Sequence, residues 1–343
     1  MKIIKLNMKK ILLVLIFLLC VNIVNASIVV MDADSGRILY SKNKEEKKLI
    51  ASTTKIMTSI IALEHAPLDM KIRIGKEVRT VNGSMIYVKE GEIFTLNDLL
   101  HGLMLQSGND AAMTIATNVL GYDKFIKEMN LKAVKLGMND TIFENPHGLN
   151  DDSKNYSTAK DMAILMKYAI KNKDFLSITS AKNYKVDKYI WSNKNKLLKE
   201  YKYLISGKIG FTKASGQVFV SAARKDGKTL VVVSIDESDK FNLHKKLYKK
   251  YFEIYDRYKI LDMNTFSFKV KNKNNYHYYI MNDYYILLQK NEIEKLNIKI
   301  DLTKNQEKVH IYFDNTKIDS VELKKIKFNV KKNKIKEILS FWK

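Results

Sequence analysis

The 343-residue chain has one cysteine and two prolines, and its basic residues are nearly all lysine, with only five arginines. The single cysteine, Cys20, lies in an N-terminal apolar segment. The remainder of the chain therefore excludes disulfides, thiolate zinc sites and a cysteine nucleophile. Histidine is also sparse, and the six histidines show no H-x-x-x-H or H-E pairing. We expect neither a metal nor another cofactor.

The formal net charge is +23, from 60 basic and 37 acidic residues. Such a balance normally raises nucleic acid or an anionic membrane as a partner. The excess is spread thinly over residues 27–261, is absent from residues 262–323, and is concentrated in residues 324–343, which hold eight lysines and one acidic residue. We therefore expect no nucleic-acid partner, and only the carboxyl-terminal lysines carry a functional argument.

Residues 1–26 have the three parts of a secretory signal peptide. Lys9 and Lys10 precede an unbroken apolar run over 11–21, and Val24-Asn25-Ala26 is a small-residue cleavage pattern. The run is too short for an ordinary spanning helix. The sequence thus predicts an exported protein at the extracytoplasmic face of the cytoplasmic membrane, in the periplasm or cell-wall space. An uncleaved N-terminal anchor is the alternative.

Two predicted β-hairpins enclose a mostly helical region. Apolar runs at 28–31 and 38–40 flank one turn, and runs at 218–224 and 229–235 flank another. Helical periodicity covers 50–64, 96–106, 110–119, 125–136 and 159–170, and a last helix carries Leu243, Leu247, Tyr251, Ile254 and Tyr255 on one stripe. Strands at both ends with helices between them predict an α+β fold with an antiparallel sheet flanked by helices, over residues 27–260.

After residue 260 apolar and polar residues alternate. This period of two covers 266–270, 296–302, 309–313 and, with one slip, 321–328. The pattern predicts a small all-β domain over residues 261–330.

Residues 331–343 have the pattern of a short amphipathic helix. Ile335, Ile338, Leu339 and Trp342 share one helical face, and lysines surround it. A tryptophan and several lysines around an apolar face are typical of a helix that lies at a membrane surface. We expect this tail to associate with the cell membrane, although three turns are short for stable attachment alone.

Three short motifs carry the chemistry. Ser52-Thr53-Thr54-Lys55 opens an apolar helix, where positions i and i+3 are neighbours, so a lysine of depressed pKa can take the proton of a serine nucleophile. Ser107-Gly108-Asn109 separates two helical segments, and Lys208-Ile209-Gly210 enters a predicted strand. S-x-x-K alone is common, but the three motifs in this order are typical of penicillin-binding proteins and class A β-lactamases.

The chain resembles the low-molecular-weight penicillin-binding proteins, which are serine-type D-alanyl-D-alanine carboxypeptidases, over residues 27–260. Beyond the three motifs, the resemblance rests on the stretches 32–40, 51–58, 98–112, 145–149 and 156–161. It implies a β-lactamase/penicillin-binding transpeptidase-like domain followed by the β-domain. It also implies a hydrolase that trims the terminal D-alanine from pentapeptide stems of peptidoglycan and is inhibited by β-lactam antibiotics.

The resemblance implies four catalytic roles. Ser52 would be the nucleophile that forms an acyl-enzyme, and Lys55 would be the general base. Ser107 would relay a proton toward the leaving amine, while Asn109 would contact the substrate and Lys55.

The third motif and the two residues after it are implied to bind the substrate. Lys208 would keep the site positive, and Gly210 and Thr212 would lie along the substrate. The backbone N–H groups of Phe211 and of the nucleophile would form the oxyanion hole.

Ile209 stands where the family has a threonine whose hydroxyl helps to bind the terminal carboxylate of the substrate. Losing a hydrogen bond to a charged acceptor costs about 1.5–3 kcal/mol. We therefore predict weakened carboxypeptidase activity, or a preference for substrates that lack this carboxylate. Thr212, Lys194 or Arg224 could supply the missing donor.

Three other readings stay open. A D,D-endopeptidase would cleave cross-links through the same acyl-enzyme, and a catalytically weak protein of this fold would only bind peptidoglycan. A β-lactamase is disfavoured because the stretch 144–150 lacks a glutamate at the expected spacing and Gly108 replaces the usual aspartate. His147, which follows a proline in a loop, is predicted to be structural.

Overall fold

The computed structural model describes residues 26–149, 154–270, 276–303 and 307–327. The predicted membrane-associating tail and the predicted signal peptide, apart from Ala26, lie outside these residues. In the described part of the chain, no helix combines the length and hydrophobicity needed to cross a bilayer.

An antiparallel five-stranded sheet forms the centre of the first domain, in the order β2-β1-β11-β10-β9. Its strands are β1 (Ser27–Asp32), β2 (Ile38–Lys42), β9 (Leu204–Thr212), β10 (Gly216–Lys225) and β11 (Lys228–Ile235). Strand β1 pairs with β11 along its whole length, so the two ends of the domain meet in one sheet. Both predicted hairpins and the predicted sheet are confirmed, and β9 lies at the edge.

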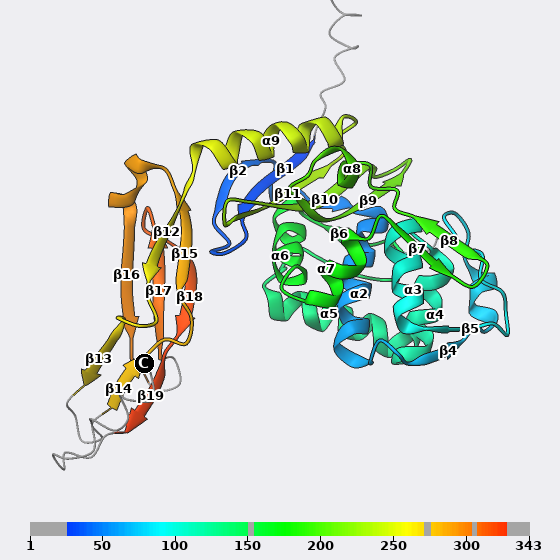
Figure 1. The fold of residues 1–343 in the computed structure, drawn as a ribbon, viewed down its shortest axis with the longest axis horizontal. Coiled ribbons are helices and arrows are strands. Elements are labelled where there is room, and N and C mark those ends of the chain that lie inside the picture. The colour runs from blue at the N-terminus through cyan, green and yellow to red at the C-terminus, as the bar shows by residue number, and fades with distance from the viewer. Residues whose placement is uncertain (1–25, 150–153, 271–275, 304–306, 328–343) are drawn as a thin grey trace, which may run out of the picture.

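Helices from the middle of the chain lie on one side of this sheet (Figure 1). They are α2 (Lys55–His65), α3 (Leu96–His101), α4 (Asn109–Val119), α5 (Tyr122–Leu136), α6 (Ala159–Ala169) and α7 (Lys173–Ser180). Short strands in the connecting segments form small two-stranded sheets. They are β3 (Lys48–Leu49) with β6 (Tyr156–Ser157), β4 (Lys71–Arg73) with β5 (Ile93–Thr95), and β7 (Asn183–Val186) with β8 (Tyr189–Ser192). Helix α2 is buried in the largest hydrophobic cluster, together with apolar residues of α6 and β11. An apolar helix at this position carries the first motif.

The opposite face of the sheet is covered by α9 (Lys240–Ile254) and α8 (Leu197–Glu200). The predicted apolar stripe of α9 was partly wrong. The helix buries His244, Tyr248, Tyr251 and Phe252, whereas Ile254 is exposed and Leu243 and Leu247 are only half-buried. Buried polar atoms explain the difference, because the His244 ring bonds to two serine hydroxyls of the sheet, those of Ser221 and Ser234.

The second domain is all β, as predicted. Its strands form three small antiparallel sheets: β12 (Asp256–Leu261) with β15 (Tyr284–Leu288); β13 (Ser267–Val270), β14 (Tyr276–Tyr279) and β19 (Lys324–Lys327); and β16 (Leu296–Asp301), β17 (Lys308–Phe313) and β18 (Thr316–Glu322). Strand β12 already belongs to these sheets, so pairing begins before the predicted boundary at residue 260. The predicted slip at 321–328 is a change of sheet, from β18 to β19.

The β1–β2 turn lies beside the β-domain (Figure 1), and polar contacts join the two domains there. Arg37 donates to the carbonyl of Leu287 at 2.8 Å and pairs with Glu292 at 2.6 Å. Its guanidinium also stacks 3.6 Å from the ring centroid of Phe313. Asp32 accepts from the backbone N–H of Leu287 at 3.0 Å. These bonds fix the β-domain against the sheet domain.

Candidate active site

The first motif forms a tight turn at the start of α2. A single 3₁₀ turn, η1 (Ala51–Thr54), runs directly into the helix at Lys55. Ala51, the residue before Ser52, has a φ of 45°, a left-handed conformation that non-glycine residues rarely adopt. Strained backbone of this kind persists where surrounding contacts enforce it, often at functional sites.

Lys55 is completely buried beside Ser52. Its Nζ lies 3.0 Å from Oγ of Ser52, 2.7 Å from Oδ1 of Asn109 and 2.6 Å from the carbonyl oxygen of His147. Burial, followed by the charge of Lys208, lowers the pKa of Lys55 well below its ordinary value. A neutral amine here can donate one N–H to each carbonyl-type oxygen and direct its lone pair at the serine hydroxyl.

The second motif follows a π-helical turn, η3 (Gly102–Gln106). The π-helical turn ends at Gln106, and Ser107 follows with a left-handed φ of 66°. Helix α4 begins two residues later at Asn109. This break turns the Ser107 hydroxyl toward strand β9, where Nζ of Lys208 lies 3.0 Å away. Lys208 is nearly fully buried, and burial and then the charge of Lys194 lower its pKa to about 7.

The third motif lies on edge strand β9, next to the nucleophile turn. A Cβ at Gly210 would come within 3.0 Å of the backbone nitrogen of Ser52, so only a glycine allows this close approach without a shift. Phe211 follows, and this residue is 61% exposed. The hydroxyl of Thr212 bonds to Ser215 in the turn to β10.

Ile209 faces away from Lys208. It pairs with Phe219 of β10 and packs half-buried against the cluster under α9, whereas Lys208 pairs with Val220 of the opposite core. Alternation along a strand explains this arrangement. Of the residues proposed from the sequence to replace the missing hydroxyl, Lys194 lies near the site, with Nζ donating to the carbonyl of Gln106.

Arg224 lies away from the third motif. It is at the far end of β10, beside the turn to β11, and its Nε donates to Thr229 at 3.1 Å. The predicted role of Arg224 as a compensating donor therefore has no geometric support.

The loop at 145–149 lies beside Lys55 at the start of α2. The sequence did not predict that the backbone of this loop would contact the site. The His147 carbonyl accepts from Lys55, while burial, followed by the charge of Lys55, lowers the pKa of the His147 ring to about 3 and keeps it neutral. Gly148 has a φ of 91°, and a Cβ there would clash with the backbone of Ala51. The stretch Asn145-Pro146-His147-Gly148 was a sequence signal for this loop, but no pattern indicated which atoms it presents.

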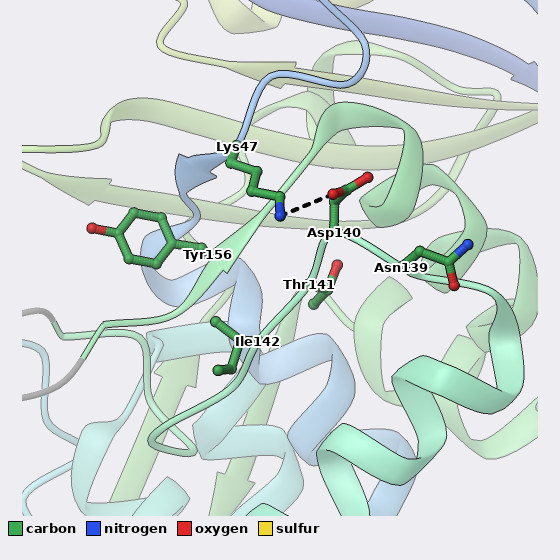
Figure 2. A pocket seen from close by; sticks show the side chains of 6 residues that line it. All are labelled: Lys47, Asn139, Asp140, Thr141, Ile142 and Tyr156. Carbon is green, nitrogen blue, oxygen red and sulfur yellow. Dashed lines mark ion pairs between the residues drawn. The ribbon is translucent and has the colours of Figure 1, made fainter.

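A separate surface hollow of about 390 Å³ lies beside β6 (Figure 2). It is lined by Lys47, Asn139, Asp140, Thr141, Ile142 and Tyr156. Lys47 and Asp140 form an ion pair of 2.9 Å within it. None of these residues belongs to the three motifs, so the cluster around Ser52, and not this hollow, is the candidate active site.

The geometry defines a class of protein, the serine acyl-transfer enzymes, because a completely buried lysine of lowered pKa stands beside the serine. Comparison with known proteins agrees. A profile of peptidase family S11, described as D-alanyl-D-alanine carboxypeptidase, matches residues 20–239. The chain belongs to this family.

Individual relatives support the same assignment. D-alanyl-D-alanine carboxypeptidase DacF of Bacillus subtilis is 34% identical over 218 residues, which cover 60% of this chain and 56% of that protein. DacB2 of Mycobacterium tuberculosis is 33% identical over 60% of this chain and 72% of its own length. The chain thus spans just over half the length of DacF.

The fold comparison extends to the second domain. The crystal structure of penicillin binding protein 5 from Haemophilus influenzae superposes with a TM-score of 0.72 at 24% identity, covering 88% of this chain and 96% of that one. At this identity the match shows the fold alone, which includes the β-domain.

Proposed function

We propose that the protein is a serine D-alanyl-D-alanine carboxypeptidase that removes the terminal D-alanine from pentapeptide stems of peptidoglycan. One observation carries the proposal. The Lys55 amine is buried, has a lowered pKa and lies 3.0 Å from the Ser52 hydroxyl. An uncharged amine at this distance can accept the hydroxyl proton when the serine attacks.

The reaction proceeds in two acyl transfers. Ser52 attacks the carbonyl carbon of the penultimate D-alanine while its proton passes to Lys55. The oxyanion accepts hydrogen bonds from the backbone N–H groups of Ser52 and Phe211. The C–N bond then breaks as the proton on Lys55 passes by way of the Ser107 hydroxyl to the departing amine, and free D-alanine leaves. Water attacks the remaining ester, its hydroxyl stays on the acyl carbon, and its proton passes by way of Lys55 to the Ser52 oxygen.

Two lysines bind the terminal carboxylate. Lys208 bonds to the Ser107 hydroxyl and Lys194 bonds to the Gln106 carbonyl, so both cationic groups lie beside the second motif. The Ile209 side chain cannot donate and packs toward the α9 side of the sheet. Binding of the carboxylate therefore rests on charge, with Gly210 and Thr212 lining the strand along which the substrate backbone lies.

β-Lactam antibiotics would acylate the same serine and leave slowly. This property separates the proposal from a β-lactamase, which would turn over nitrocefin rapidly. A catalytically weak peptidoglycan-binding protein of this fold would not be labelled by a fluorescent penicillin.

Purified protein incubated with muropeptides, with products identified by mass spectrometry, tests the proposal. The expected product is the tetrapeptide stem plus one D-alanine, and Ser52→Ala should abolish it. Splitting of cross-linked dimers without release of D-alanine would instead establish an endopeptidase. No product and no penicillin label on the unmodified protein would refute acyl-enzyme chemistry.

We also propose that the protein is exported and works outside the cytoplasm. The signal-peptide pattern in residues 1–26 and the amphipathic pattern in residues 331–343 support this. Cell fractionation after deletion of residues 331–343 tests whether this tail holds the protein at the membrane. If the signal peptide is cleaved and the deletion leaves the protein on the membrane, the tail is not what holds it there.

A further inference from the structure

Asp110 follows the second motif directly, yet none of the catalytic steps above uses it. It is the second residue of α4, and its carboxylate is fully inaccessible to solvent. One oxygen accepts from the N–H of Ile86 at 3.0 Å and the other from the N–H of Tyr87 at 2.8 Å. A third bond comes from the N–H of Ala111 at 2.9 Å. Each of these partners is a donor, which suits an ionised carboxylate. Burial raises the pKa of Asp110, and these backbone N–H groups act in the opposite direction.

These bonds tie α4 to residues 86 and 87, which lie in the segment 81–92 between the 3₁₀ turn η2 (Lys76–Thr80) and β5. The backbone of this segment is strained, because Tyr87 has a φ of 62° in the left-handed region. The carbonyl of Tyr87 also accepts from the Tyr189 hydroxyl at 3.3 Å. Without the carboxylate, the two backbone N–H groups of Ile86 and Tyr87 would lose their acceptor.

The segment in turn orients the amide of Asn109. The backbone N–H of Asn109 donates to the carbonyl of Ser84 at 2.7 Å, and its Nδ2 donates to the carbonyl of Asn82 at 2.6 Å. Because the NH₂ group is committed to a carbonyl, Oδ1 must face the other way, toward Lys55. A flipped amide would place two acceptors together at Asn82.

We propose that Asp110 is a positioning residue for Lys55. By holding residues 82–87, it fixes the Asn109 amide so that Oδ1 accepts an N–H of Lys55 and the amine lone pair points at Ser52. Asp110 touches no reacting atom. The inference rests on the proposed acyl-enzyme chemistry.

The charge of Asp110 gives a second readout. Burial and the charges of Lys208 and Lys194 all lower the pKa of Lys55. The Asp110 carboxylate opposes them and raises this pKa. His147, which also packs on Lys55, is neutral at the working pH. Removing the carboxylate charge should therefore lower the pKa of Lys55 further. Lys55 then stays deprotonated down to a lower pH. The acid limb, which is the fall of the acylation rate as Lys55 becomes protonated, therefore moves to lower pH.

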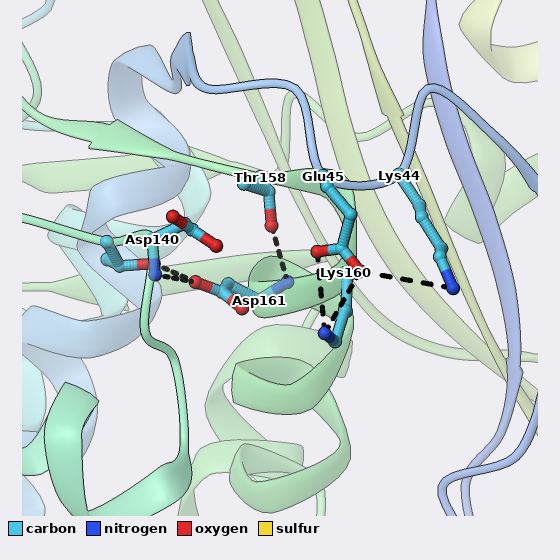
Figure 3. Close-up of polar contacts among 7 residues, drawn as sticks. Lys44, Glu45, Asp140, Thr158, Lys160 and Asp161 are labelled. Atoms are coloured by element: carbon cyan, nitrogen blue, oxygen red, sulfur yellow. Dashed lines mark hydrogen bonds and ion pairs between the residues drawn. The ribbon is translucent and has the colours of Figure 1, made fainter. Parts of the chain in front are cut away.

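The chain offers a matched control in Asp161 of α6 (Figure 3). It is also buried, near the start of a helix, and accepts from the backbone N–H of Asp140 at 2.9 Å and the hydroxyl of Thr141 at 2.8 Å. Its helix is capped by Thr158, whose hydroxyl accepts from the Asp161 N–H. Asp161 thus ties a loop to a helix as Asp110 does, but away from the three motifs.

The experiment measures the acylation rate constant with a fluorescent penicillin across pH, on the complete protein and on Asp110→Asn and Asp161→Asn. In Asp110→Asn an NH₂ group meets a backbone N–H, so we expect acylation about tenfold to a hundredfold slower at its plateau, with the acid limb at lower pH. Asp161→Asn should lose stability but keep both the rate per folded molecule and the limb.

Wild-type rate and limb in Asp110→Asn would overturn the inference. If that variant does not fold, Asp110→Glu replaces it. This variant keeps the charge but displaces it, so the limb should stay in place while the rate falls, and an unchanged rate would overturn the inference. Failure of the unmodified protein to be labelled would instead refute the proposed function.

Discussion

Nζ of Lys55 lies 2.7 Å from Oδ1 of Asn109, although 54 positions separate the two residues in the chain. The bond joins the first turn of α2 to the first residue of α4. It commits one N–H of the amine and leaves the lone pair for Ser52. The activity of the site therefore depends on how firmly the two helix starts are held relative to each other.

The pKa of Lys208, lowered to about 7, predicts a pH dependence of substrate binding. A lysine with a lowered pKa is cationic below that value and neutral above it. We expect kcat/KM for a peptide with a free terminal carboxylate to fall as the pH rises through about 7. A matched ester whose leaving group lacks a carboxylate serves as control and should not show this fall. The same alkaline fall for both substrates would contradict a carboxylate-binding role for Lys208.

Replacing Lys194 by methionine should move the alkaline fall of kcat/KM to higher pH. The charge of Lys194 contributes to lowering the pKa of Lys208, so its removal raises that pKa and shifts the alkaline limb upward. KM for the carboxylate substrate should also rise about tenfold, since one charge-assisted hydrogen bond is worth about 1.5–3 kcal/mol. Steady-state kinetics over a pH series measures both effects. Lys196→Met, a change at a neighbouring exposed lysine, is the control.

Ile209→Thr should raise carboxypeptidase activity about tenfold to a hundredfold by restoring a hydroxyl donor. The side chain packs half-buried under α9, so the exchange should also cost about 1 kcal/mol of stability. Ile209→Val keeps the apolar character without the donor and is the control. If D-alanine release does not rise in the threonine variant, the isoleucine does not limit carboxylate binding.

Gly148→Ala should abolish acylation. The added Cβ would overlap the backbone carbonyl of Ala51, and the left-handed φ of 91° adds strain. Because Ala51 precedes the nucleophile, the turn at Ser52 has to shift. Gly137→Ala, at another left-handed glycine with open space around it, controls for strain alone and should keep the penicillin labelling.

The link between the domains should contribute measurably to stability. Arg37 and Glu292 have side chains only 7% and 16% exposed, so Glu292→Gln leaves a nearly buried charge without its partner. We expect a loss of about 3 kcal/mol in the free energy of unfolding, the lower end for a buried pair. Denaturant unfolding measures it. Glu200→Gln, in the exposed pair with Lys245, should change stability by less than about 1 kcal/mol.

The hairpins, the helices and the three motifs were predictable because their signals are local. Turn residues between apolar runs, a period of 3.6 residues and the S-x-x-K spacing each act over a few positions. The buried face of α9 was predicted only in part, because the His244 ring is satisfied by Ser221 and Ser234 from distant strands. Hydropathy along a helix does not register such partners.

The sequence by itself determined the residue types of the site and their order, since a serine and a lysine three positions apart meet in any helix. Only the tertiary structure decided what surrounds them. It buries Lys55 and Lys208, brings the His147 carbonyl to the amine and sets Asp110 against residues 86 and 87. These relations depend on desolvation and on backbone groups far apart in the chain, and neither is encoded in local pattern.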